Sequence, residues 1–202
     1  KQALVTGFLT QNDAVCGVET EFGDRFHAKA VVVATGTFLS GKLHYGLRSF
    51  PGGRAGDPPS AELAAAIREQ LKLHVGRLKT GTPPRIDSRS IDYSKLERQD
   101  GEEHPTPYSA DTDLAELETR PKLPCYIAYT NEKTHGIIRE NIGRSPLYSG
   151  EIHGIGPRYC PSIEDKVVRF PDKTRHQLFV EPTGLGTGEM YLEGFSSSMP
   201  AD

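Results

Sequence analysis

The sequence has few cysteines, no long apolar run and no large excess of charge of either sign. Its three cysteines are far apart and form no CxxC pair, which excludes a disulfide scaffold or a cysteine zinc site, and we predict no metal. The longest apolar run, Ala30–Ala34, is too short to cross a bilayer, and no signal peptide is visible. A reducing cytoplasm is therefore the simplest compartment, and no membrane contact is expected.

Charge is nearly balanced, with 24 Lys and Arg against 27 Asp and Glu. A net charge of −3 gives no general attraction to nucleic acid, so a nucleic-acid surface would have to be a local patch. The first residues already have the pattern of a strand, and the last ones show no terminal signal of their own. We therefore expect an internal piece of a larger protein.

Strand and helix patterns alternate along the chain, which predicts an α/β or α+β fold. Strands are expected at 3–10, 15–20, 25–30, 31–36, 75–82, 123–130 and 176–182, the fourth of them buried on both faces of a parallel sheet. Residues 46–59 and 88–120 are expected to be loop and surface excursion. Helices are expected from Ser60, from a cap at Thr134, and over 163–169 with Ser162 and Asp165 capping each other.

Three glycine-rich segments could approach a phosphate or a cofactor. GTFLSGKL, residues 36–43, nearly matches a P-loop but has Leu43 where a hydroxyl would hold Mg²⁺, so a turn after a strand, at Gly36, is the better interpretation. GGRAGDPPS, residues 52–60, ends at a helix N-terminus, where N–H groups can bind anions. TGLGTGEM, residues 183–190, is not a dinucleotide fingerprint and is typical of a flexible turn.

Basic residues gather in two places, and both could contact phosphates or be solvated faces paired with carboxylates. One cluster is Arg77, Lys79, Arg85 and Arg89, and the other is Arg139 and Arg144 with His135 nearby.

Cys160 precedes the predicted cap Ser162 by two residues and has arginines around it. The helix dipole and the arginines favour the nucleophilic thiolate, whereas Glu164 and Asp165 oppose it. A buried cysteine acting as a small apolar residue is the alternative. Cys125 and Cys16 are expected in the core and in a strand.

Several long blocks resemble one family. VVVATGTFLSGKLHYG, GGRAGDPPS, GRLKTGTPPRID, CYIAYTNEKTH, RSPLYSGEIHGIGPRYCPSIEDKVVRF and FVEPTGL occur in this order and are similar to the middle of the GidA (MnmG) family of FAD-dependent enzymes that modify tRNA uridine. The resemblance implies part of a glutathione-reductase-type, Rossmann-like FAD/NAD(P)-binding domain, with an inserted mixed α+β NAD-binding subdomain. Residues 1–75 would belong to the FAD domain, and 76–202 to the inserted NAD-binding and substrate subdomain, returning toward the FAD domain at its end.

The resemblance also implies cofactors and site residues. The cofactors are FAD, NAD(H) and methylene-tetrahydrofolate as one-carbon donor, and Cys160 would act on the uracil ring, by covalent addition at C6 or by carrying protons. The cofactor-binding positions implied or suggested above are Val5, Gly36, Ser60, Gly156, Pro157, Arg158, Tyr159, Cys160, Pro161, Ser162, Ile163, Glu164, Asp165, Lys166, Val167, Val168, Arg169 and Phe170.

The implied reaction adds a carboxymethylaminomethyl or aminomethyl group at C5 of the tRNA wobble uridine, with the GTPase MnmE as partner and a homodimer as the assembly. The family's N-terminal FAD fingerprint, its second functional cysteine and its MnmE-binding helical region do not occur in these residues. The 202 residues alone are therefore expected to bind FAD poorly and to be inactive.

Three other functions remain open. A folate- and FAD-dependent tRNA (uracil-5-)methyltransferase of the TrmFO type would use a related flavin domain, but the GPRYCPSIEDKV block argues against it. A non-catalytic nucleic-acid or partner-binding module would not need Cys160. A pyridine-nucleotide–disulfide oxidoreductase would need a CxxC-type pair.

Overall fold

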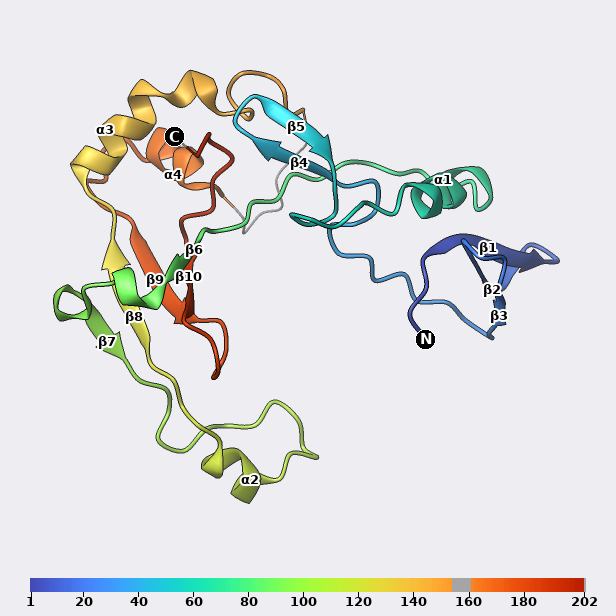
Figure 1. The fold of residues 1–202 in the computed structure, drawn as a ribbon, viewed down its shortest axis with the longest axis horizontal. Coiled ribbons are helices and arrows are strands. Elements are labelled where there is room, and N and C mark those ends of the chain that lie inside the picture. Colours follow the sequence, from blue (N-terminus) through green and yellow to red (C-terminus); the bar gives the residue numbers. More distant parts are fainter. Residues whose placement is uncertain (154–160, 202) are drawn as a thin grey trace. The chain divides into compact units, whose positions relative to one another are not determined.

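Short runs rich in apolar and β-branched residues near the start of the chain form a three-stranded antiparallel sheet in the order β1-β2-β3 (Figure 1). The computed structural model describes residues 1–153 and 161–201. The strands are β1 (Val5–Gln11), β2 (Ala14–Thr20) and β3 (Arg25–His27). Asn12 and Asp13, with φ of 50° and 60°, make the tight β1–β2 turn, since Asn and Asp tolerate this left-handed conformation better than most residues.

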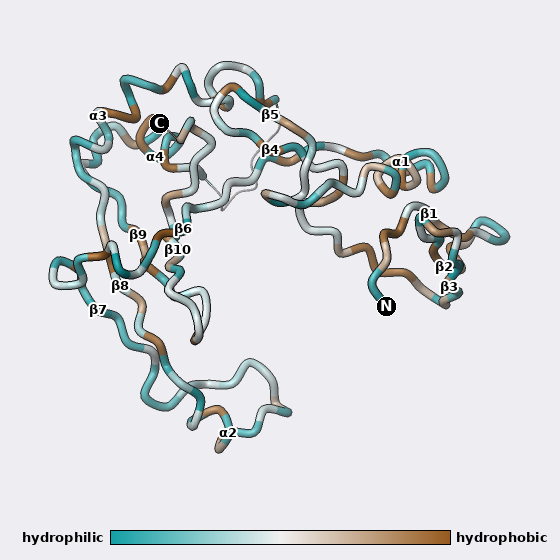
Figure 2. The backbone as a smooth tube through the Cα atoms, in the orientation of Figure 1, coloured by the Kyte–Doolittle hydropathy of each residue, from teal (hydrophilic) through white to brown (hydrophobic). Residues whose placement is uncertain are grey.

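Helix α1 (Ala61–Glu69) packs its apolar stripe on this sheet. Phe8 of β1 and Leu63, Ala66 and Ile67 of α1 form the buried core, and the apolar stretches of α1 and β1 can be followed in Figure 2. The Gln70 side chain fixes the helix end to the sheet, because its Oε1 accepts a hydrogen bond of 2.9 Å from the Phe8 N–H. Between sheet and helix the chain forms the hairpin β4 (Lys42–Tyr45) and β5 (Arg48–Pro51).

The chain divides into two units: residues 1–77 with 199–202, which contain the elements above, and residues 78–198. The second unit contains a five-stranded antiparallel sheet in the order β6-β10-β9-β8-β7. Its strands are β6 (Arg85–Asp87), β7 (Glu97–Gln99), β8 (Cys125–Tyr129), β9 (Gln177–Pro182) and β10 (Glu189–Glu193).

Helices α3 (Glu132–Glu140) and α4 (Ile163–Arg169) pack against each other in the second unit, and α2 (Leu114–Thr119) lies in a largely exposed excursion. Short 3₁₀ turns occupy Ser88–Ser90, Tyr93–Lys95 and Ile142–Arg144. The mixed α/β class predicted from the sequence is confirmed. Among the described residues, no helix has the length and apolar character needed to cross a membrane.

Several local predictions are wrong. Residues 31–34 are irregular rather than a strand of a parallel sheet, and Val32 is 89% exposed. An apolar run signals burial, but a strand also needs a neighbouring strand to hydrogen-bond with. Residues 75–82 are mostly irregular, and the following segment supplies β6 instead.

Two other errors concern a hairpin and the helix caps. Residues 46–59 were expected to be loop, but Arg48–Pro51 pairs with β4 because Gly46, at φ 57°, permits a tight turn there. Asn131 rather than Thr134 caps α3, since its Oδ1 accepts 2.9 Å from the Thr134 N–H. Ser162 caps α4 as predicted, but the carboxylate of Asp165 bonds Tyr148 and Arg169 instead of completing a reciprocal cap.

Candidate functional site

The first candidate site is a small hollow at the start of α1. It has a volume of about 80 Å³ and is lined by Leu4, Val5, Pro59, Ser60, Ala61, Glu62 and Leu63. The fold thus brings together Val5 and Ser60, two of the predicted cofactor-binding residues. The Ser60 hydroxyl makes no capping hydrogen bond to α1, so a ligand can use it together with the unpaired N–H groups of the first turn. The hollow is large enough for a phosphate or part of a sugar, not for a whole dinucleotide.

The glycine-rich loop before α1 is held by hydrogen bonds between its own residues. The Thr37 hydroxyl donates 2.6 Å to the Gly53 carbonyl, and the Gly52 N–H donates 3.0 Å to that of Gly41. Arg54 forms an ion pair of 2.7 Å with Asp57. Gly36 is exposed, in a left-handed conformation with φ 54°. The predicted turn at Gly36 is therefore present, in a separate part of the loop from the Val5–Ser60 hollow.

The predicted reactive thiol of Cys160 lies outside the described residues. The same holds for the predicted cofactor-binding residues just before it, Gly156, Pro157, Arg158 and Tyr159. The chain that follows is well anchored. The Ile163 N–H donates 2.7 Å to the Ser196 carbonyl, and the Ser196 hydroxyl donates 3.4 Å to that of Pro161.

Helix α4 carries the second half of the predicted cofactor segment, and most of it is used in packing. Ile163 and Val167 are each 1% exposed, and Ser162 and Glu164 are fully buried. Lys166 donates 2.9 Å to the Gly194 carbonyl. Within residues 161–170, the part of the segment that the structure describes, the exposed side chains that could meet a ligand are those of Val168, Arg169 and Phe170.

Glu164 places a fully buried carboxyl group on α4. Its Oε1 accepts from the N–H and hydroxyl of Ser198, at 3.2 and 3.1 Å, and from the Ser145 hydroxyl at 3.3 Å. Its Oε2 is buried without a hydrogen-bond partner among the described residues. Nothing in the local sequence of Ser145 or Ser198 indicates this contact, because the three residues meet only through the tertiary fold.

Asp165 and Tyr148 form a second contact of α4. The Tyr148 hydroxyl donates 3.0 Å to the Asp165 carboxylate, and burial, with this bond, raises the pKa of Tyr148 to about 12. Tyr148 is therefore a hydrogen-bond donor at neutral pH and not a base. Cys125 is half-buried on β8, where burial raises the pKa of its thiol and so disfavours the thiolate. Cys16 is half-buried on β2, in a strand as predicted.

The first predicted basic cluster is divided, because Arg77 belongs to the first unit and Lys79, Arg85 and Arg89 to the second. Arg77 donates to the Ser40 carbonyl, and Lys79 is buried. Arg85 lies over the Tyr191 ring, 4.6 Å from its centre, and also donates to Thr82. These guanidinium groups already have partners within the chain.

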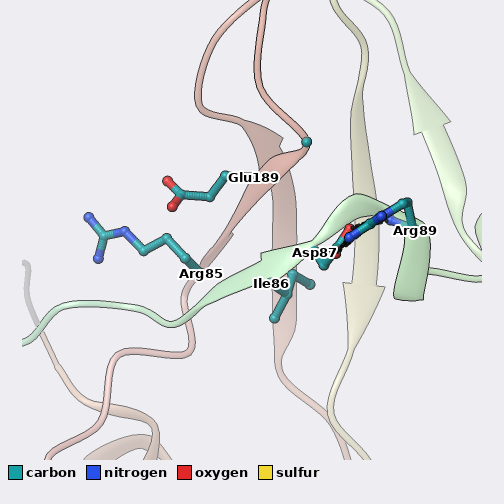
Figure 3. A pocket seen from close by; sticks show the side chains of 6 residues that line it. Arg85, Ile86, Asp87, Arg89 and Glu189 are labelled. Atoms are coloured by element: carbon teal, nitrogen blue, oxygen red, sulfur yellow. Dashed lines mark hydrogen bonds and ion pairs between the residues drawn. The ribbon is translucent and has the colours of Figure 1, made fainter.

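Arg85 and Arg89 line an open groove of about 590 Å³ along β6 (Figure 3). The other lining residues are Ile86, Asp87, Gly188 and Glu189. Arg89 pairs with Asp87, and this hydrogen bond lowers the pKa of the Asp87 carboxyl. The carboxylates of Asp87 and Glu189 thus offset the positive charges of Arg85 and Arg89, so the groove has no excess positive charge to attract an anion. Sequence reasoning missed Glu189, which reaches the groove because β10 pairs with β6.

The residues of the second basic cluster also have hydrogen-bond partners within the chain. Arg139 donates 3.2 Å to the Pro171 carbonyl, and Arg144 donates 3.3 Å to the Asn141 side chain. His135 is 1% exposed and bonds the Thr130 hydroxyl at 2.8 Å. No group of three or more His, Cys, Asp or Glu side chains that could hold a metal ion occurs within the described parts of the chain.

Comparison with known proteins extends over the whole chain. The model of the family described as glucose inhibited division protein A matches residues 1–202. The tRNA uridine 5-carboxymethylaminomethyl modification enzymes MnmG of Geobacter sulfurreducens and Geotalea uraniireducens are 56% and 54% identical over all 202 residues. The chain spans 32% of the length of each of these relatives.

A solved structure shows the same fold. Aquifex aeolicus GidA, in its form I crystal, superposes with a TM-score of 0.83 at 48% identity, covering 99% of this chain and 34% of that one. The family resemblance predicted from the sequence blocks is confirmed. With every residue matched by the family model and the fold matched by a solved member, this chain belongs to the GidA family, glucose inhibited division protein A.

Proposed function

We propose that the full-length protein modifies tRNA, adding an aminomethyl or carboxymethylaminomethyl group at C5 of the wobble uridine in a flavin-dependent reaction. The observation that carries this proposal is the identity of 54–56% to MnmG enzymes across every residue of the chain. The chain spans about a third of those relatives, so the activity is proposed for the whole protein.

FAD is the proposed resident cofactor, and it would supply hydride chemistry when bound. The hollow at the start of α1 supports this, because it offers a hydroxyl at Ser60 and helix N–H groups, which suit a ribose or a phosphate. Val5 would provide an apolar wall. We propose Gly36, on its exposed turn, as a further contact for the cofactor.

Cys160 is the proposed catalytic residue. Its thiolate would add to C6 of the uracil, which is conjugated to the C4 carbonyl, and C5 would become the nucleophile. C5 then attacks the iminium carbon formed when the carbon of methylene-tetrahydrofolate is transferred to ammonium or glycine, with release of tetrahydrofolate, so that the amine nitrogen enters together with the one-carbon unit. Loss of the C5 proton and departure of the thiolate restore the C5–C6 double bond. In the alternative role, the sulfur does not add to C6 and only carries protons, accepting the one that leaves C5.

NADH is proposed as the donor of the hydride that reduces the flavin, with residues 156–170 near its site. The exposed end of α4 supports a contact through Val168, Arg169 and Phe170, whereas Ile163, Glu164 and Val167 would act by shaping the segment. The GTPase MnmE as partner, a homodimer and a cytoplasmic location are proposed on the family likeness.

The test is mass analysis of nucleosides from tRNA of cells that lack the full-length gene. We expect loss of 5-carboxymethylaminomethyl-type modification at the wobble uridine and its return with a plasmid copy. Intact wobble modification together with missing 5-methyluridine would point to a folate-dependent methyltransferase instead. A deletion strain with unchanged tRNA nucleosides of both kinds would reject the proposal.

A further inference from the structure

Charge is strongly segregated in the first unit. Residues 25–56 contain no Asp or Glu, although the whole chain has a net charge of −3. The basic residues of this run are Arg25, Lys29, Lys42, Arg48 and Arg54. Arg25 and Arg54 pair with carboxylates outside the run, at Glu19 and Asp57. Among the described residues, neither Lys42 nor Arg48 forms an ion pair, so the β4–β5 hairpin is a local site of positive charge.

This hairpin is held in one shape by its turn. Gly46 adopts φ 57° between Tyr45 and Arg48, which are directly opposite each other in the register. A Cβ placed on Gly46 would lie 2.7 Å from Cγ of Pro200, a residue of the same unit, so the turn is closely packed. The backbone of the hairpin is therefore held at its turn, next to Tyr45 and Arg48.

One face of the hairpin combines aromatic rings with a guanidinium group. Residues opposite each other share a face and residues alternate along a strand, so Leu43, Tyr45, Arg48 and Phe50 lie on the same side. The Tyr45 and Phe50 rings are stacked, with centres 5.7 Å apart and planes 7° apart. They are 49% and 47% exposed, and Leu47 at the turn is 57% exposed. Large apolar side chains exposed together mark an interaction surface.

We propose that this face, defined by Tyr45, Arg48 and Phe50, binds an unpaired stretch of RNA; the inference rests on the proposed tRNA substrate. A flat aromatic surface stacks on a base, and Arg48 beside it meets a phosphate. Unpaired nucleotides are required, because bases inside a duplex do not offer their faces. The absence of acidic residues from 25 to 56 fits a polyanion and not a basic protein partner.

The experiment measures binding of an unmodified tRNA transcript to the full-length protein by fluorescence anisotropy at several salt concentrations. Removing the ring in Tyr45→Leu or Phe50→Leu should weaken binding about tenfold, whereas Tyr45→Phe should retain the affinity. Arg48→Gln should lower the salt dependence, with a slope smaller by about 0.7. Matched controls in the other unit are Tyr108→Leu, an exposed ring, and Arg98→Gln, which removes the same charge; both should bind as the wild type does.

The outcomes separate this site from the proposed function. A wild-type protein that does not bind tRNA contradicts both. Wild-type binding with unchanged affinity in Tyr45→Leu and Phe50→Leu overturns the hairpin site alone. Melting temperature and flavin content are measured on every variant. If the variants with weaker binding also have a lower melting temperature and a lower flavin content, the face packs against the rest of the protein. That result would also overturn the site.

Discussion

Val5, at the start of the first strand, and Ser60, the residue before the first helix, line the same hollow. The main-chain bonds of Ser60 explain how the loop brings them together: its N–H donates 2.8 Å to the Phe38 carbonyl, and its own carbonyl accepts 3.3 Å from the Ser40 N–H. The side chain takes no part in these bonds as a helix cap. Ser60 thus has a fixed backbone and an available hydroxyl, as a ligand-binding serine requires.

Ser60→Ala should separate ligand binding from stability. Because the hydroxyl makes no capping bond, the free energy of unfolding should change little, while FAD dissociates more readily from the full-length protein. Asn131→Ala is the opposite case, since Asn131 caps α3 at 2.9 Å; it should cost about 1 kcal/mol of stability and leave flavin affinity unchanged. Flavin titration and urea unfolding measure the two effects. A large loss of stability in Ser60→Ala would contradict this assignment.

Gly41→Ala should disturb the loop that leads to the hollow. A Cβ on Gly41 would collide with the main-chain oxygens of Thr37 and Gly52, neither of which can rotate away. We expect a loss of roughly 1–3 kcal/mol and a lower flavin content. Gly101→Ala is the control, because a Cβ there meets nothing within 4 Å. Equal thermal unfolding of the two variants would show that the loop is not tightly packed.

Glu164→Ala should destabilise the second unit. It removes the acceptor for two hydrogen bonds from Ser198 and one from Ser145 in a buried place, which costs roughly 1–3 kcal/mol. Glu164→Gln keeps an acceptor oxygen and should lose less. Glu140→Ala, at an exposed position of α3, serves as the control. Thermal unfolding of all three in the full-length protein tests this, and an Ala variant as stable as Glu140→Ala would refute it.

His176 should make stability depend on pH. Burial lowers its pKa below the ordinary value of 6.5, and the charges of His135, Lys166 and Lys173 act in the same direction. The unfolded chain therefore binds the proton more readily, so stability is full above pH 6.5 and falls as the pH decreases from there toward the folded pKa.

Urea unfolding at a series of pH values, from 8 downward, measures this dependence. His176→Gln should flatten the curve in the acidic range. His104→Gln, at a side chain that is 81% exposed, should leave the wild-type slope in place. A slope that persists in His176→Gln would assign the titration to another group.

Local patterns predicted those elements whose partners are close in sequence or whose signals are strong. Strands β1 and β2 are short runs rich in apolar and β-branched residues with a turn at Asn12 and Asp13 between them, and α1 and α4 begin after serines, so their positions followed from the residues. The hairpin β4–β5 was missed because glycine and proline indicate a loop, although Gly46 serves as a turn between two short strands.

Most features that the sequence did not predict depend on contacts between residues far apart in the chain. The Val31–Ala34 run indicates burial but cannot specify a pairing strand. The guanidinium groups of Arg77, Arg89 and Arg139 resemble phosphate contacts in sequence, and their carbonyl and carboxylate partners appear only in the folded chain. The pairing of Val5 with Ser60 in one hollow came from the family likeness and not from any local pattern.

The proposed chemistry on the wobble uridine depends on the thiol of Cys160. The most direct measurement is mass analysis of tRNA nucleosides from cells in which the full-length gene carries Cys160→Ser. We expect loss of the 5-carboxymethylaminomethyl-type nucleoside with normal protein and flavin levels, because a serine hydroxyl is a far weaker nucleophile and acid than a thiol. Wobble uridine modified to the wild-type extent in that strain would contradict it.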